Sequence, residues 1–348
     1  MAGERQHYIP RFLLKGFSSR TTNQKAFVWY FRKGENPIEV SIRDIALEKS
    51  FYGETGKGSL DETITENEKD YSRVIAQVRE EGYISQRNLD ILTEFVFNLV
   101  VRTRNTRKGL TEVFGTFINM FSQNISNPHT TARLLKNYRK ENKKEFRNQI
   151  RIGVRKSLGY RNPKVEELAI WRMEENLEKI GSLGPIYSTM LNKYLSQLQQ
   201  EGEKAHKKAL TRTYQREELS KRLAEYRRLI WSVKRFEPNV FIFGDIGAVQ
   251  FNFKTKEFHS SIFNKMNEGA LLLSIAHDTL LVGISDDNLT LPSPNDINTG
   301  IAELNMDFFV ASSNGEREKA YSEIMGTRAT LLDDKTANEL EREYFRVK

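Results

Sequence analysis

The chain has 348 residues and a formal net charge of +8, and it contains no cysteine. This length is enough to bury a large core in one domain or two. The lack of cysteine excludes disulfides, thiolate nucleophiles and Cys-ligated metal sites. No apolar run approaches a membrane span, and Lys15 and Gly16 interrupt the apolar N-terminal stretch too early for a signal peptide. We therefore expect a cytoplasmic protein, and the charge favours a polyanionic partner such as DNA.

The stretch at residues 7–18 (HYIPRFLLKGFS) is unusually rich in residues with special roles. Pro10 disfavours helix before it and can begin one after it, which predicts an extended entry followed by a short helix. His7, Tyr8 and Arg11 would then lie near the helix N-terminus, where the backbone dipole favours an anion. His7 is therefore a candidate for orienting a phosphate, or else an ordinary packing histidine.

The next hundred residues alternate between short strands and long helices. Residues 26–31 and 38–42 read as strands, and a Gly-rich loop that lacks the spacing of a phosphate-binding loop leads into a helix over residues 60–82. Glu62 and Glu66, four positions apart, point the same way on that helix. They form either a solvated acidic face that suits the helix N-terminus or a metal-binding or acid/base pair.

A helix over residues 86–104 is apolar nearly all round, so it should lie at the centre of the fold. Asn98 lies inside this run and needs a hydrogen-bond partner if it is buried. Arg102, Arg104 and Arg107 lie at the end of this helix. They either complement the helix dipole or form bidentate contacts with phosphates.

Residues 109–236 read as a helical insertion or arm. Its segment 133–156 is strongly basic, with aromatic residues interleaved. This pattern is typical of a surface that binds a nucleic-acid backbone, but also of a long solvated helix. The cations that we single out as DNA contacts are Arg139, Lys143, Arg147 and Arg151.

From residue 237 the pattern changes to strands. An apolar strand at 239–243 ends in Gly244-Asp245, and 270–276 with 279–284 should form a hairpin. Desolvation at the strand end would raise the pKa of Asp245 and suit a general base, with glycines nearby that let a ligand approach. The other interpretation is a turn aspartate that caps backbone groups.

The predicted fold class is α+β, mostly helical. A mixed or antiparallel sheet core would be built from both chain ends, residues 1–108 and 237–348, around the long basic helical insertion at 109–236. The N-terminal strands are expected to join the C-terminal sheet, because neither set alone is large enough.

The opening motif resembles the signature of a bacterial family of unknown function, DUF4238. Weaker similarities follow in the same order, at Phe51-Tyr52, a Glu62/Glu66/Glu68 cluster, Arg102-Thr103-Arg104 with Arg107, residues 241–245, and a strand-rich end with Asn298 and residues 308–311. The resemblance covers nearly the whole chain. It implies a bacterial cytoplasmic protein of the mobile or phage-defence gene pool that acts on nucleic acid.

Together, these features lead us to expect a DNA glycosylase of antiphage defence, which excises a modified base from phage DNA without a cofactor. Asp245 would activate water, Arg11 and Arg102 would hold phosphates, and Tyr8 and Tyr52 would hold the flipped base.

Two alternatives stay open. The first is a metal-dependent nuclease with Mg²⁺ held by Glu62, Glu66 and Asp245. Against it, no Glu-x-Lys pair follows Asp245. The second is a non-catalytic nucleic-acid-binding sensor or toxin partner, in which the N-terminal motif is purely architectural.

Overall fold

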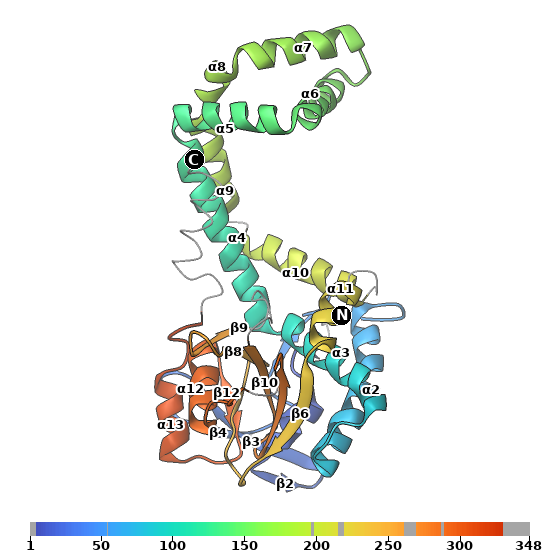
Figure 1. The fold of residues 1–348 in the computed structure, drawn as a ribbon, viewed down its shortest axis with the longest axis vertical. Helices are drawn as coiled ribbons and strands as arrows, with labels where there is room; N and C mark the ends of the chain where they lie inside the picture. Colours follow the sequence, from blue (N-terminus) through green and yellow to red (C-terminus); the bar gives the residue numbers. More distant parts are fainter. Residues whose placement is uncertain are drawn as a thin grey trace. The chain divides into compact units, whose positions relative to one another are not determined.

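The computed structural model describes residues 5–53, 55–195, 198–214, 219–260, 269–286 and 289–329. They fold as two compact units. The first combines residues up to 110 with those from 202 onward, and the second contains residues 111–201 (Figure 1). The predicted α+β class, with a core built from both chain ends, is confirmed. The helical insertion is shorter than expected, because residues 202–236 belong to the first unit.

The larger antiparallel sheet of the first unit has the order β6-β11-β10-β8-β9. The predicted hairpin is present as β10 and β11, with Leu272 opposite Val282. Strand β6 lies within the residues that we expected in the helical insertion, and its pairing with β11 makes it an edge of the sheet. The strands are β6 (Ile230–Arg235), β8 (Val249–Asn252), β9 (Glu257–Ser260), β10 (Gly269–Ala276) and β11 (Thr279–Ile284).

The second sheet joins the two chain ends, as predicted. Its order is β2-β3-β12-β7, with β4 paired to β3, and Phe31 of β3 lies opposite Phe309 of β12. Strand β7 has only two residues, and only the first of them, Phe243, lies in the strand expected at 239–243. The strands are β2 (Arg20–Thr22), β3 (Lys25–Phe31), β4 (Ile38–Ser41), β7 (Phe243–Gly244) and β12 (Phe309–Ala311). A separate pair joins β1 (Arg5–His7) to β5 (Leu47–Lys49).

The N-terminal motif forms the predicted short helix, α1 (Arg11–Leu14), followed by a 3₁₀ turn, η1 (Lys15–Phe17). Pro10 has extended ψ and precedes the first helical residue, as its fixed φ favours. Arg79 binds α1 to the large sheet, because its guanidinium donates to the carbonyl oxygens of Phe12 at 2.9 Å and Ile275 at 2.8 Å. Gly16 allows the close approach, since a Cβ there would lie 2.4 Å from the Ile275 oxygen.

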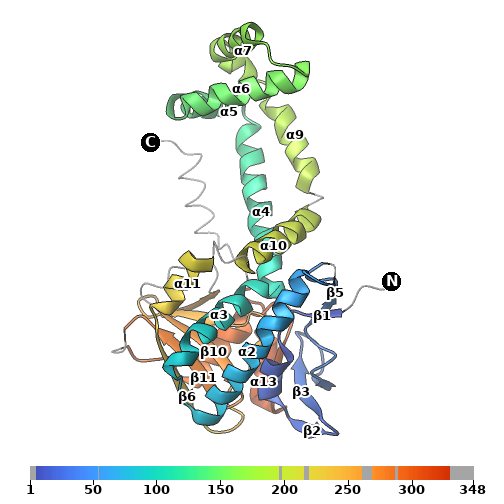
Figure 2. The same ribbon diagram turned by 90° about the vertical axis from the view of Figure 1, so that its right-hand side faces the viewer.

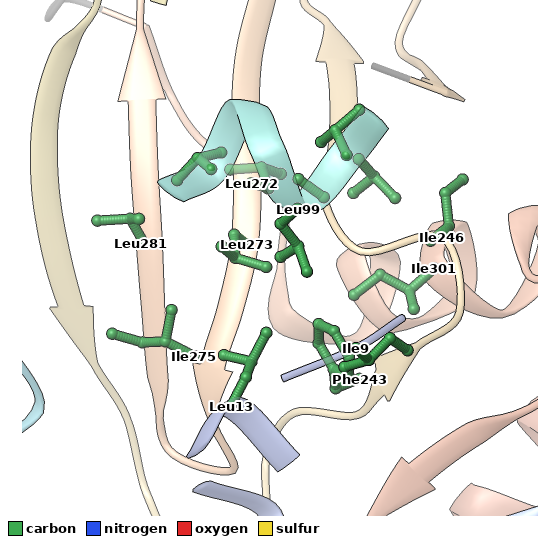
Figure 3. Close-up of a cluster of buried hydrophobic side chains, with 14 of the residues drawn as sticks. Ile9, Leu13, Leu99, Phe243, Ile246, Leu272, Leu273, Ile275, Leu281 and Ile301 are labelled. Atoms are coloured by element: carbon green, nitrogen blue, oxygen red, sulfur yellow. The ribbon is translucent and has the colours of Figure 1, made fainter. Parts of the chain in front are cut away.

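Helices α2 (Leu60–Glu81) and α3 (Gln86–Arg102) cover one face of the large sheet (Figure 2). Ser59 caps α2 by accepting a hydrogen bond from the backbone N–H of Glu62. Figure 3 shows Leu99 of α3 next to Leu272 and Leu273 of β10, with Leu13 of α1 lower in the view, near Ile275. All five side chains are at most 1 % exposed, so α3 is central as its sequence predicts.

The remaining helices of the first unit lie around the same hydrophobic core. They are α10 (Leu198–Tyr214), which begins just before the unit boundary, α11 (Leu219–Arg227), α12 (Pro294–Leu304), α13 (Glu316–Glu323) and the first turns of α4 (Arg104–Ile125). Ser293 forms a reciprocal capping box with Asp296 at the start of α12. Helix α12 lies beside β9.

The second unit is entirely helical over its described residues. It contains the rest of α4 followed by α5 (Pro128–Glu141), α6 (Lys143–Leu158), α7 (Pro163–Glu175), α8 (Leu177–Gly181) and α9 (Gly184–Leu195). Asn142 divides the basic segment into two helices. The second unit has its own small core, which contains Phe146, Ile150, Ile170 and Leu177. Across the described part of the chain, no helix is long and apolar enough to cross a membrane.

Candidate functional site

Asp245 follows β7 directly and is fully buried. Its Oδ1 accepts a hydrogen bond from the backbone N–H of Met306 at 3.0 Å, and its Oδ2 accepts one from Asp307 at 2.6 Å. Burial raises the pKa of Asp245 to about 7, against the opposing effect of these two hydrogen bonds. The desolvation of Asp245 predicted from the sequence is therefore present. Its carboxyl group also caps two backbone N–H groups, which was the other interpretation.

The Asp307 carboxylate holds two cations from the start of α4. It accepts from Arg104 Nη1 at 3.1 Å and from Lys108 Nζ at 2.5 Å, and 19 % of its side chain is exposed. Arg104 and Lys108 are four positions apart, so they extend from the same face of the helix. A buried carboxyl and a partly exposed, ion-paired carboxylate thus lie side by side.

The two phenols Tyr8 and Tyr30 complete this group, which we call the Asp245–Asp307 site. Burial, reinforced by the charge of Asp245, raises the pKa of Tyr8, so the phenol keeps its proton. Burial likewise raises the pKa of Tyr30 on β3. Tyr8 is 4 % exposed and its ring packs on Phe51, which leaves no free face for a base.

The packing of Asn305 explains why the residue before Asp245 is a glycine. A Cβ at Gly244 would lie 1.9 Å from the Asn305 side-chain oxygen, and that same oxygen accepts a hydrogen bond from the backbone N–H of Ile246. Gly244 therefore makes room for Asn305 and not for a ligand, which corrects the sequence interpretation. Gly247 has φ +78°, a conformation that favours glycine.

Arg102 is 2 % exposed and binds the N-terminal motif. It donates to the carbonyl oxygens of His7 at 3.0 Å and Tyr8 at 3.1 Å, and to the Glu68 carboxylate at 2.6 Å. Tyr52 donates its hydroxyl to the same His7 oxygen at 3.0 Å and is 5 % exposed. In this structure Arg102 and Tyr52 therefore hold the motif in place, contrary to the phosphate-binding and base-holding roles expected for them.

His7 lies half buried, within reach of the charges on Arg11, Glu68 and Arg102. Burial lowers its pKa, and the exposed Arg11 lowers it further. The imidazole is thus favoured in its neutral form, which supports packing or hydrogen bonding more than charge pairing with a phosphate.

Two other candidates near α3 also have protein partners. Arg107 binds the Glu48 carboxylate at 2.6 Å, and its guanidinium lies 4.5 Å from the centroid of the Phe51 ring. Asn98 donates to the Tyr71 hydroxyl at 2.7 Å, so the predicted partner for a buried asparagine is confirmed. Arg107 and Arg104 share Glu48, the latter at 3.6 Å.

Glu62 and Glu66 lie exposed on the first turns of α2. Glu62 accepts a hydrogen bond from the backbone N–H of Gly58 at 2.5 Å, as expected of an acidic residue at a helix N-terminus. Among the described residues, no three acidic or histidine side chains gather closely enough to share a metal ion. Glu62, Glu66 and Asp245 therefore do not form the trio that the nuclease hypothesis requires.

The positive charge of the basic segment of the second unit is partly compensated by glutamates of α7. Arg147 binds the Glu174 carboxylate at 3.0 and 3.1 Å, Arg151 binds Glu167 at 2.8 Å, and Arg139 donates to the Glu174 carbonyl oxygen at 3.3 Å. Lys143 is exposed. The expected cationic surface is thus partly an internal ion-pair network that joins α6 to α7.

Sequence reasoning missed Asp307, Lys108 and Tyr30. No local motif marks them, since Lys108 and Asp307 are 199 positions apart. The glutamates that compensate the basic helix had a visible signal, because the acidic α7 comes directly after it along the chain.

The fold and site define an α+β protein with one buried and one partly exposed carboxyl group between β7, β12 and α4, and an inserted helical unit. The chain belongs to the family described as a protein of unknown function, DUF4238, whose family model matches residues 5–288. No curated protein and no solved structure matches the chain.

Proposed function

We propose that this protein is a DNA-acting hydrolase of bacterial antiphage defence that works in the cytoplasm. The proposed reaction is hydrolysis of the N-glycosidic bond of a modified base in phage DNA. The observation that supports it best is the Asp245–Asp307 pair, in which Asp245 has a pKa of about 7 and Asp307 is held by Arg104 and Lys108.

This pair has the properties that glycosidic hydrolysis needs. A carboxyl group with a pKa near 7 is about half ionised at neutral pH, and as a carboxylate it is a stronger base than an ordinary aspartate. Asp245 would align and deprotonate the water that attacks the sugar C1′, the bond from C1′ to the base would break, and the base would leave with a proton from solvent, while Asp307 would stabilise positive charge on the sugar. Two carboxyl groups in different environments are a recurring way to divide these roles.

Both oxygens of Asp245 accept backbone hydrogen bonds, so water and substrate reach this group only if the turn at Met306 and Asp307 moves. Asp307, which is partly exposed, is the residue at which a substrate would first arrive. The proposal therefore includes an opening of this turn when DNA binds.

DNA binding would depend on exposed lysines and not on the paired arginines of the second unit. Lys140, Lys143 and Lys144 are all exposed around the junction of α5 and α6. Lysines at such a site neutralise phosphates without sequence preference, which suits an enzyme that searches DNA.

The engagement of Arg102, Tyr52 and Asp245 in structural contacts also favours a second candidate, a nucleic-acid-binding sensor or toxin partner without catalysis. In that case the N-terminal motif serves the fold, and the second unit alone carries the recognition surface.

The test is incubation of the purified chain with plain DNA and with phage DNA that carries modified bases, each with and without EDTA. Strand breaks are scored before and after alkali. Breaks that need alkali, occur only in modified DNA and persist in EDTA support the glycosylase. Direct breaks that EDTA abolishes would indicate a nuclease, and binding without breaks would indicate the sensor.

A further inference from the structure

Helices α4 and α9 of the second unit pack closely as an antiparallel pair. Ser122 Oγ lies 2.8 Å from both Ser188 Oγ and the Asn192 side-chain oxygen. Further along α4, a Cβ at Gly184 would lie 2.2 Å from the Ile125 carbonyl oxygen. Higher residue numbers on α4 thus contact lower residue numbers on α9, as expected for antiparallel helices. Small side chains at the contact let the two backbones approach closely.

One flank of this pair exposes large apolar side chains. Phe114, Phe117 and Phe121 are spaced three and four positions apart, which places them on one side of α4. The rings of Phe117 and Phe121 stack with their centroids 6.5 Å apart. On α9, Tyr187 and Met190 are exposed as well.

The two apolar flanks belong to the same face of the pair. Measured from the contact line at Ser122 and Ser188, the helical period places Phe121 and Tyr187 about 100° round their helices in the same rotational sense. In an antiparallel pair, equal rotation turns both side chains toward the same side. The opposite flank of α4 is polar, with exposed Thr116, Asn119 and Gln123.

We propose that this face, defined by Phe114, Phe117, Phe121, Tyr187 and Met190, binds the same face of a second copy of the chain. The five side chains are between 37 % and 52 % exposed, which at about 200 Å² for each fully exposed side chain gives roughly 450 Å² of apolar surface per copy. A stable interface buries about 800 Å² per partner, of which a little over half is apolar, so this face supplies the apolar part of a dimer interface.

Charge favours a second copy as the occupant. Residues 111–125 contain one charged residue, Glu112, and residues 184–195 contain one, Lys193, whereas the whole chain carries +8. Two copies repel each other over most of their surfaces, and this face is where they can meet without opposing charges. A two-fold arrangement of two such pairs gives a four-helix bundle, in which identical patches satisfy each other.

The test is the mass of the full-length chain in solution over a range of concentrations, by light scattering and sedimentation. The double variant Phe117→Asp with Phe121→Asp should weaken dimerisation at least about tenfold, because four buried carboxylates would meet. The control Thr116→Asp with Gln123→Asp adds the same charges on the polar flank and should leave the dimer intact. A wild-type monomer at every concentration, or equal effects of both variants, would overturn the proposal.

A second measurement does not depend on the fold of the charged variant. Because the chain has no cysteine, Met190→Cys introduces a single thiol on the apolar face, and Asn119→Cys introduces one on the polar flank. Oxidation should join two copies efficiently through residue 190 and poorly through residue 119. Equal cross-linking at the two positions would contradict the assigned face.

Discussion

Asp245 accepts a 2.6 Å hydrogen bond from the backbone N–H of Asp307, although the two residues are 62 positions apart. This bond ties the end of β7 to the turn before β12, and so the buried carboxyl group of Asp245 fixes the backbone that carries the partly exposed Asp307. The ionisation state of Asp245 is therefore coupled to the geometry of Asp307 and to the cations that Asp307 binds.

The raised pKa of Asp245 predicts a stability that falls as pH rises. The pKa of Asp245 is about 7 in the folded chain and 3.8 for an ordinary aspartate, as in the unfolded chain. Between pH 3.8 and pH 7 the folded state therefore keeps a proton that the unfolded state loses. The stability change over this window is about 4 kcal/mol. Asp245→Asn cannot titrate and should flatten this part of the profile in urea denaturation at pH 4.5 to 7.5. Parallel profiles for the variant and the wild type would contradict the raised pKa.

For His206 we expect the opposite pH dependence, a stability that rises with pH. It is fully buried, its Nε2 lies 3.0 Å from the Val101 carbonyl oxygen, and burial lowers its pKa from 6.5 to about 4. Its contribution is complete above pH 6.5 and is lost as pH falls toward 4, by about 3 kcal/mol. His206→Gln should therefore lose less stability on acidification than the wild type. An unchanged acid limb in the same urea series would refute this.

Gly16 predicts a large effect of one added methyl group. Gly16→Ala would place Cβ against the Ile275 carbonyl oxygen and the Arg79 guanidinium, so the contact between η1 and β10 must open. We expect a loss of about 2 kcal/mol or more in the free energy of unfolding. The neighbouring exposed Lys15→Ala should cost less than about 0.5 kcal/mol. Similar unfolding midpoints for the two variants would show that the turn can relax.

Local patterns predicted most elements but not their partners. The helices around Ile75 and Leu99 and the hairpin at Leu272 were predictable because each buries its own periodic apolar residues. Strand β6 was not, because its residues are only partly buried and its identity as a strand depends on pairing with β11.

The candidate site shows the same division. The burial of Asp245 could be predicted from the apolar run before it, whereas the ion pair between Lys108 and Asp307 exists only in the folded chain. Arg102 at the end of α3 was recognised as special, but two of its partners are backbone oxygens of His7 and Tyr8, which a pattern of charges along the sequence does not predict.

The exposed lysines predict the salt dependence of DNA binding. The double variant Lys143→Glu with Lys144→Glu should weaken binding and reduce the slope of log affinity against log salt by about 2, because two phosphate contacts disappear. Arg147→Glu should instead destabilise the second unit, since it removes the partner of Glu174. Titration of labelled DNA at several salt concentrations, with thermal unfolding in parallel, separates the two effects. An unchanged slope for the lysine variant would place DNA elsewhere.

The most direct test of the central claim is the release of free base from modified phage DNA, detected by mass spectrometry, for the wild type, Asp245→Asn and Asp307→Asn. We predict base release by the wild type, and a loss of at least about a hundredfold in Asp245→Asn at unchanged DNA affinity. Asp307→Asn should be impaired as well. Base release by Asp245→Asn at the wild-type rate, or no release by any of the three proteins, would contradict the role of the Asp245–Asp307 site.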